Sequence, residues 1–217
     1  RAGYCVLVVG RLQQAMHRSV ADLASCRLVA EPFCSPMLCD IVANTTRANE
    51  KHWASIDYSA ATDGLSGSYS AAIFKAITVG NDASPHPTVA KFAEVGRRVL
   101  GYHHLQYPVF HYEEHRGVRV KKRAIVRGAD QTNGQLMGSP MSFPILCLAN
   151  LGVYYQALVE SGNPDACEYV RLSYRNLKKC DDEERREIRA RMSELYGRLD
   201  RACLTNGDDQ LYLATEE

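Results

Sequence analysis

The stretch that most constrains this chain lies near its far end, where Asn206-Gly207-Asp208-Asp209 separates two short apolar runs. Glycine tolerates positive φ, and Asn and Asp side chains bond nearby backbone amides, so the stretch favours a tight turn. The flanking runs, Ala202-Cys203-Leu204 and Leu211-Tyr212-Leu213, supply the two arms of a β-hairpin. The pattern therefore predicts a hairpin with two acids at its tip.

Asp208 and Asp209 bring two negative charges to that tip. Adjacent ionised carboxylates repel each other, and a bound divalent cation relieves the repulsion. A plain surface Asn-Gly-Asp turn is the competing interpretation. Partner residues elsewhere in the chain must decide between the two.

A second acidic stretch runs from Ser55 to Ser66. Ile56 and Tyr58 alternate around Asp57, as at the end of a strand, and Asp63 then opens a helical run that extends to about residue 79. Strand ends are places where a rigid scaffold meets solvent, so Asp57 is well placed for chemistry. Asp63 also fits the plain role of a helix N-cap.

A third stretch, residues 133–144, is a glycine-bearing loop that leads into a helix predicted from about Ser142 to Glu160. Ser142 suits the N-cap of that helix. Gly134 and Gly138 let the backbone approach a ligand closely, and free amides at a helix start favour anions such as phosphate. A junction between a glycine-bearing loop and a helix is also common in proteins where it has only a structural role.

Between these stretches, residues 88–104 predict a helix, and residues 108–126 read as extended around an Arg116-Gly117 turn. Basic side chains on the return strand can contact RNA phosphates. A solvated strand edge guarded by Lys is the alternative. The candidate phosphate contacts are Arg119, Lys121, Lys122 and Arg123.

Composition narrows the remaining options. The net charge of +1 over 217 residues means that nucleic-acid affinity must come from local patches. The eight cysteines lack the spacing of a disulfide framework, which predicts reduced thiols. Cys26, Cys34 and Cys39, together with His52, suggest a zinc site, although no C-x-x-C pair exists. No apolar run approaches the roughly 20 residues that span a bilayer, so we predict no membrane segment.

The three stretches, in this order, resemble the palm motifs of viral RNA-dependent RNA polymerases. Residues 55–66 look like motif A, residues 133–150 like motif B and residues 204–213 like motif C. Gln135 to Pro140, together with Asn206 before the Gly-Asp-Asp, resembles the ourmia-like and narna-like branch of positive-strand RNA viruses. The resemblance spans about residues 55 to 213.

The resemblance implies an α+β fold, a polymerase palm with a small antiparallel sheet backed by helices, in which the strand ending at Asp57 lies beside the acidic hairpin. Residues 1–50 would belong to the fingers and residues 51–217 to the palm core. The thumb would lie beyond Glu217, and the basic finger motif that holds the triphosphate is missing or upstream. The isolated chain is therefore expected to be an inactive fragment.

The implied activity is RNA-directed RNA polymerisation by a two-metal mechanism, with Mg²⁺ or Mn²⁺ as cofactor, and an RNA template, nascent strand and ribonucleoside triphosphates as partners. Replication would take place in the host cytoplasm or the mitochondrion. The implied site comprises the metal-binding carboxylates Asp57, Asp208 and Asp209, the ribose-reading Asp63 with Ser142 or Asn150, and the template loop residues Gly134, Gly138 and Ser139.

Two other functions compete with this one. A reverse transcriptase shares the palm, but its acidic hairpin normally has an aromatic residue where Asn206 stands, and its sugar site favours a bulky residue over Asp63. A non-enzymatic RNA-binding or cysteine-metal module is supported by the basic hairpin and by the three cysteines at 26, 34 and 39.

Overall fold

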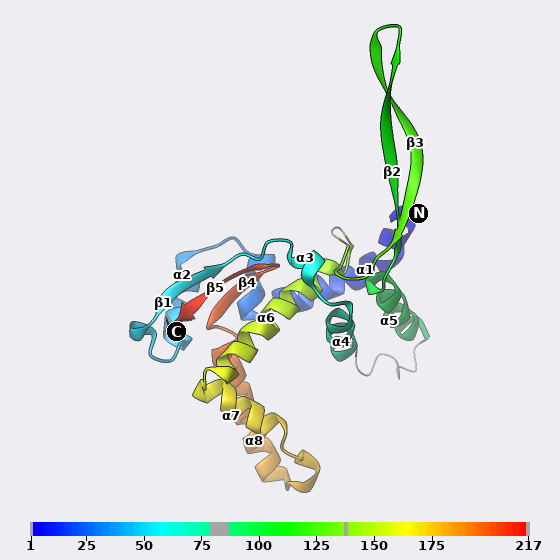
Figure 1. Cartoon of the computed structure of the whole chain (residues 1–217). Coiled ribbons are helices and arrows are strands. Elements are labelled where there is room, and N and C mark those ends of the chain that lie inside the picture. The colour runs from blue at the N-terminus through cyan, green and yellow to red at the C-terminus, as the bar shows by residue number, and fades with distance from the viewer. Residues whose placement is uncertain (1, 79–86, 137–138, 216–217) are drawn as a thin grey trace. The chain divides into compact units, whose positions relative to one another are not determined.

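A computed structural model describes residues 2–78, 87–136 and 139–215 (Figure 1). The chain forms two compact units. The first contains Arg1–Ala61 and Pro140–Glu217, and the second contains the intervening Thr62–Ser139. Residues 1–50 thus fold in the same unit as most of the segment that follows residue 140, and their assignment to the fingers stays a prediction.

A three-stranded antiparallel sheet organises the first unit. Its strands are β1 (His52–Ile56), β4 (Cys203–Asn206) and β5 (Asp209–Ala214), in the order β1-β5-β4. The hairpin predicted from the Asn-Gly-Asp turn is therefore confirmed as β4 and β5. The strand predicted to end at Asp57 pairs with that hairpin, as expected, so the chain has the small antiparallel sheet of the predicted α+β fold.

Helices and 3-10 turns cover both faces of this sheet. They are α1 (Ala2–Ala21), η1 (Ala24–Val29), α2 (Ser35–Asn44), η2 (Ala48–Glu50) and α6 (Ser142–Glu160). Successive strand residues point to opposite faces. Cys203 accordingly packs with Cys147 and Tyr154 of α6, whereas Leu204 packs with Met37 and Ile41 of α2.

Helix α6 is long and apolar enough, by length and composition alone, to cross a membrane. Our prediction that no run of that character exists was therefore wrong. In this fold the helix is a core element, because Cys147, Leu151 and Tyr154 are buried against α1, η1 and β4. The helix begins one residue earlier than a Ser142 cap requires: Met141 occupies the N-cap position and Ser142 is the first helical residue.

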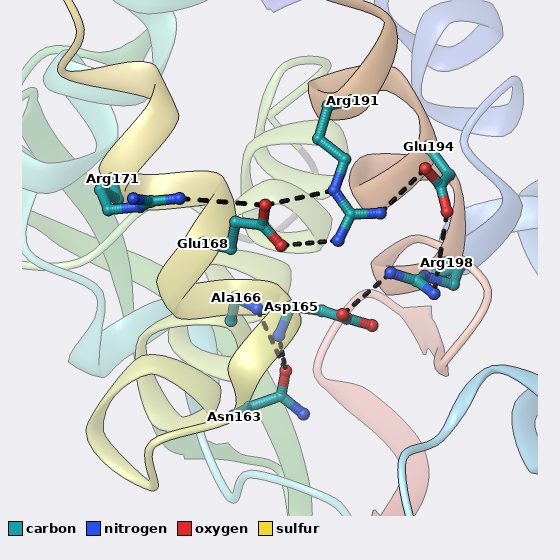
Figure 2. Close-up of polar contacts among 8 residues, drawn as sticks. All are labelled: Asn163, Asp165, Ala166, Glu168, Arg171, Arg191, Glu194 and Arg198. Carbon is teal, nitrogen blue, oxygen red and sulfur yellow. Dashed lines mark hydrogen bonds and ion pairs between the residues drawn. The ribbon is translucent and has the colours of Figure 1, made fainter. Parts of the chain in front are cut away.

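A helical hairpin follows α6 in the chain. It consists of α7 (Pro164–Ser173) and α8 (Asp182–Leu199), joined through η3 (Leu177–Lys179), and ion pairs connect the two helices (Figure 2). The Arg191 guanidinium donates to both oxygens of Glu168, at 3.2 and 2.6 Å, and Arg198 donates to Asp165 at 2.9 Å. Leu172, Ile188 and Leu195 form the apolar seam of the helix pair. The α8 helix then delivers the chain to β4.

Asp200, directly after α8, ties that helix to the N-terminal segment. Its carboxylate accepts hydrogen bonds from the Ala24 and Ser25 amides, at 2.8 and 3.2 Å, and from Ser25 Oγ at 2.7 Å. Asp200 and Ser25 are both buried. The contact closes a separation of 176 residues in sequence.

We expect Asp200→Ala to lower the free energy of unfolding by about 3 kcal/mol, because the two buried Ser25 donors and the part-buried Ala24 amide lose a charged acceptor. Urea denaturation followed by circular dichroism measures the change. Glu31→Ala, at an exposed position nearby, is the matched control and should alter stability by less than about 0.5 kcal/mol. Equal stability of the two variants would contradict the role of Asp200.

The second unit contains helices and a long two-stranded ribbon. Its elements are α3 (Ala61–Gly64), which starts at the unit boundary, α4 (Gly67–Ile77), α5 (Pro87–Leu100), β2 (His104–His115) and β3 (Val118–Asp130). The predicted hairpin is confirmed and is longer than expected. Positive φ at both Arg116 and Gly117 matches a type I′ turn. The helix predicted to reach residue 104 ends at Leu100, just before Gly101.

Candidate active site

The strand register gathers the predicted carboxylates at one end of the sheet. The last β1–β5 pair joins Ile56 to Gln210, and Asp57 and Asp209 are the next residues past this pair on their two strands. Asp209 also closes the β4–β5 ladder opposite Asn206, which leaves Gly207 and Asp208 as the connecting turn. Asp57 is thus brought to the same end of the sheet as Asp208 and Asp209, about 150 residues later in the sequence.

The turn geometry explains why glycine precedes the acids. Gly207 has φ of +69°, and it is the only one of the two turn residues with a positive φ. A two-residue hairpin turn with glycine at its first position is typical of type II′. A Cβ at position 207 would also lie 3.1 Å from the Phe143 ring. Asp208 is therefore held on a short loop with little freedom.

Side chains on one face of α6 hold this turn in place through hydrogen bonds. The Asn150 side-chain amide donates to the carbonyl oxygens of Gly207 and Asp208, at 3.3 and 3.1 Å, and the Gly207 amide donates to Cys147 Sγ at 3.2 Å. Burial raises the pKa of the Cys147 thiol to about 11, so the sulfur stays protonated. Phe143, Cys147 and Asn150 follow the i, i+4, i+7 spacing of one helix face.

A buried amide on β5 completes the support. Gln210 Nε2 donates to Thr205 Oγ1 at 3.0 Å and to the Asn150 carbonyl at 3.4 Å. Gln210 and Thr205 are both buried, and they bridge β5, β4 and α6 directly behind the acids. Sequence reasoning missed Gln210, Thr205 and Cys147. The signal available was the polar Gln210 at an inward position of an otherwise apolar strand.

Asn150 therefore occupies a different environment from the one predicted. Its side chain is buried and its amide group is directed at the turn, which makes it a support of the acidic hairpin in this structure. Its Oδ1 atom is buried without a hydrogen-bond partner among the described residues. Ser142 is likewise buried, at the start of α6. The ribose contact of either residue stays a prediction.

The acids differ in their surroundings. Asp57 and Asp209 are exposed and Asp208 is half-buried. Asp209 lines a cavity of about 180 Å³ together with Ser55, Asn206 and Leu211. Within the described part of the chain, no three His, Cys, Asp or Glu side chains are gathered closely enough to hold a metal ion. The three carboxylates thus share a sheet edge without forming a closed ligand set.

The three cysteines of the predicted zinc site lie in different environments. Cys26 is buried in the core beside Cys147 and Cys203, whereas Cys34 and Cys39 are exposed. Burial raises the pKa of the Cys26 thiol to about 12, which disfavours the thiolate that zinc binds. Across the residues that the structure describes, the predicted zinc ligands do not form a cluster.

A second group of predicted residues meets inside the other unit. The Gln135 amide donates to the Thr62 carbonyl at 2.7 Å, and the Asn133 side chain donates to the Asp63 carbonyl at 3.3 Å. Gly134, with φ of +75°, lies against this backbone. Asp63 and the start of the glycine loop are thus neighbours, as a shared nucleotide role requires.

The remaining predicted residues are only partly described. Gly138 lies outside the described residues, and the Ser139 backbone amide donates to the Leu136 carbonyl at 2.9 Å. Arg119, Lys121 and Lys122 are exposed on β3. The side chain of Arg123 falls outside the described part.

His17 on α1 connects the N-terminal helix to this site. Its ring stacks on Phe143 at a centroid distance of 5.5 Å, and burial lowers the pKa of His17 below the ordinary value of 6.5. The folded chain therefore binds this proton less readily than the unfolded chain, so this contribution to stability is lost as pH falls below about 6.5.

We expect the melting temperature to fall more between pH 7.5 and pH 5.5 in the native chain than in His17→Gln, which cannot be protonated. Differential scanning fluorimetry at both pH values measures this difference. Identical pH dependence in the two proteins would show that His17 does not titrate on unfolding.

Comparison with known proteins supplies one match. Over 114 residues, 51% of this chain, the sequence is 34% identical to the RNA-dependent RNA polymerase of Ourmia melon virus (isolate Melon/Iran/VE9). The aligned part makes up 12% of that polymerase. No protein-family model matches the chain, and no solved structure matches it. About half of this chain is therefore a region similar to a viral RNA-dependent RNA polymerase.

Proposed function

We propose that this chain is the palm region of a viral RNA-directed RNA polymerase. The observation that carries the proposal is the strand register, in which Asp57 and Asp209 follow the Ile56–Gln210 pair and Asp208 sits in the adjoining turn. Similarity to the Ourmia melon virus enzyme supports the same function. The reaction is template-directed transfer of a nucleotide from a ribonucleoside triphosphate to an RNA 3′ end, with release of pyrophosphate.

Asp57, Asp208 and Asp209 would hold the divalent cations of this reaction. The donor set fits Mg²⁺, which prefers carboxylate oxygens and retains waters and substrate phosphates as further ligands. When bound, two such ions stabilise the attacking hydroxyl and the leaving pyrophosphate. The protein's own part is to keep three negative charges at one rigid edge, which α6 does by fixing the turn through Asn150 and Cys147.

The groups around Asp63 and Gly134 suit the selection of the incoming nucleotide. An exposed carboxylate beside a glycine whose backbone has no room for a side chain offers an acceptor for a ribose hydroxyl next to a closely approaching main chain. Asp63 is accordingly the residue proposed to distinguish ribose from deoxyribose. Gly138 and Ser139 would continue the loop toward the template.

This chain spans about an eighth of the matched viral polymerase, so the proposed activity belongs to a longer polypeptide. We propose that it acts in the host cytoplasm or the mitochondrion. Residues 1–217 by themselves are expected to be inactive, because the triphosphate-binding basic motif and the grip on the duplex would come from other regions.

Primer extension on an RNA template tests the proposal. A polypeptide that contains this chain together with its flanking polymerase regions should extend an RNA primer with ribonucleotides, and excess EDTA should abolish extension. Preference for deoxyribonucleotides would favour the reverse-transcriptase alternative. Extension by residues 1–217 alone would overturn the fragment proposal, and extension that persists in EDTA would overturn the metal mechanism.

A further inference from the structure

The ribbon formed by β2 and β3 has two chemically different faces. Cross-strand partners share a face, and successive residues alternate between faces. Tyr112 pairs with Lys121 and Glu114 with Arg119, whereas the intervening pairs join His111 to Lys122 and Glu113 to Val120. We call the set Phe110, Tyr112, Glu114, Arg119 and Lys121 the aromatic face, and the set His111, Glu113, His115, Val118, Val120 and Lys122 the opposite face.

On the opposite face, charges are matched internally. Lys122 Nζ lies 2.5 Å from one oxygen of Glu113, and His111 Nε2 lies 2.9 Å from the other. The hydrogen bond from Lys122, followed by that from His111, lowers the pKa of Glu113. Lys122 is therefore engaged within the ribbon.

On the aromatic face, the cations lie over rings instead. Lys121 Nζ is 4.3 Å from the Phe110 ring centroid, and Arg119 Cζ is 5.6 Å from that of Tyr112. The two rings are 46% and 59% exposed. Among the side chains that the structure describes, neither Arg119 nor Lys121 forms an ion pair with a carboxylate. The face thus presents two partly exposed rings and two positive charges, with the exposed Glu114 opposite Arg119.

We propose that the aromatic face binds single-stranded RNA, with bases stacking on Tyr112 and Phe110 and phosphates contacting Arg119 and Lys121. Unpaired bases expose the planar surfaces that such rings accept, and cations beside the rings match the adjacent phosphates. A duplex hides its base planes and could use the cations alone. The choice of RNA over DNA rests on the proposed polymerase function, whereas the binding mode rests on the ribbon itself.

Fluorescence anisotropy with the 217-residue chain and a 5′-labelled 12-nucleotide single-stranded RNA tests this proposal, without nucleotides or divalent metal. Tyr112→Ala should weaken binding about tenfold, the effect of one lost base stack. Arg119→Gln with Lys121→Gln should reduce the slope of log affinity against log salt by about 1.4, the value for two phosphate contacts on a single strand. The matched control, Lys178→Gln with Lys179→Gln in η3, removes the same charge from exposed positions outside the ribbon and should bind within about twofold of the native chain.

Several outcomes would overturn the inference. They are absence of binding by the native chain at low salt, equal affinity for duplex and single strand, an equal loss in the control with Lys178→Gln and Lys179→Gln, or preferential binding to vesicles of anionic lipid. Circular dichroism of each variant checks that the ribbon folds, and Tyr112→Phe, which keeps a ring, should restore binding in a folded chain. Because the assay contains no catalysis, failure of the ribbon proposal would leave the polymerase proposal standing. If the 217-residue chain binds RNA but the longer polypeptide does not extend a primer, the polymerase proposal fails and the ribbon proposal stands.

Discussion

Asp208→Asn should lower primer extension by about a thousandfold in a polymerase polypeptide that contains this chain, because a carboxylate ligand of a catalytic cation is worth several kcal/mol of transition-state stabilisation. The fold should survive the change. Asn150 contacts the backbone carbonyls of the turn rather than the Asp208 carboxylate, so the hydrogen bonds that position residue 208 remain in the variant.

Two comparisons make this result specific. Asp57→Asn should cause a loss of similar size, since Asp57 stands beside the same sheet edge. Asp182→Asn, at the exposed start of α8, should leave extension within about twofold of the native rate. Titration of Mn²⁺ into the 217-residue chain should show weaker binding in Asp208→Asn than in Asp182→Asn. Retention of more than a tenth of the native extension rate by Asp208→Asn would contradict its role as a ligand.

Gly134→Ala should destabilise the second unit by about 3 kcal/mol or more. A Cβ at this position would lie 2.8 Å from the carbonyl oxygens of both Thr62 and Asp63, and these are backbone atoms that cannot rotate away. The positive φ of +75° adds strain of its own.

Gly162→Ala separates the two causes. Gly162 has a φ of +72°, nearly the same as Gly134, but a Cβ there would meet no atom within 4 Å. Its substitution should cost about 1 kcal/mol, the strain alone. Thermal unfolding, together with hydrogen exchange of the unit that contains each glycine, measures the difference. Equal losses in the two variants would mean that the Thr62–Gln135 junction relaxes and that the close approach is unimportant.

Local chemistry in the sequence was enough to predict the acidic hairpin. Gly207 and the Asn and Asp beside it specify a turn through their own backbone preferences, and alternation around Asp57 specifies a strand end. Pairing between β1 and β5 was expected from the resemblance to polymerases, and the register that brings Asp57 beside Asp209 is visible only in the fold.

The supports of the site were less accessible to sequence reasoning. Asn150 suggested a polar contact to a ligand, yet packing directs its amide to the turn. Cys147 is a buried core residue that also accepts a hydrogen bond from the Gly207 amide. Both functions depend on long-range contacts between α6 and the hairpin, which no local pattern encodes. A long-range contact also explains why the helix predicted to reach residue 104 ends earlier. His104 is the first residue of β2 and pairs with Asp130 of β3.

The bond between the Gln135 amide and the Thr62 carbonyl joins the two ends of the intervening unit. That unit therefore forms a loop whose two ends are joined to each other. The entropic free-energy cost of closing a loop rises by only about 0.6 kcal/mol for each doubling of its length. Insertions and deletions between these ends should thus be tolerated during evolution far more readily than changes in the sheet. The number of residues between Asp57 and Asn150 is therefore expected to vary among relatives of this chain. Relatives are better identified by the residues around Thr62 and Gln135 than by a fixed spacing between Asp57 and Asn150.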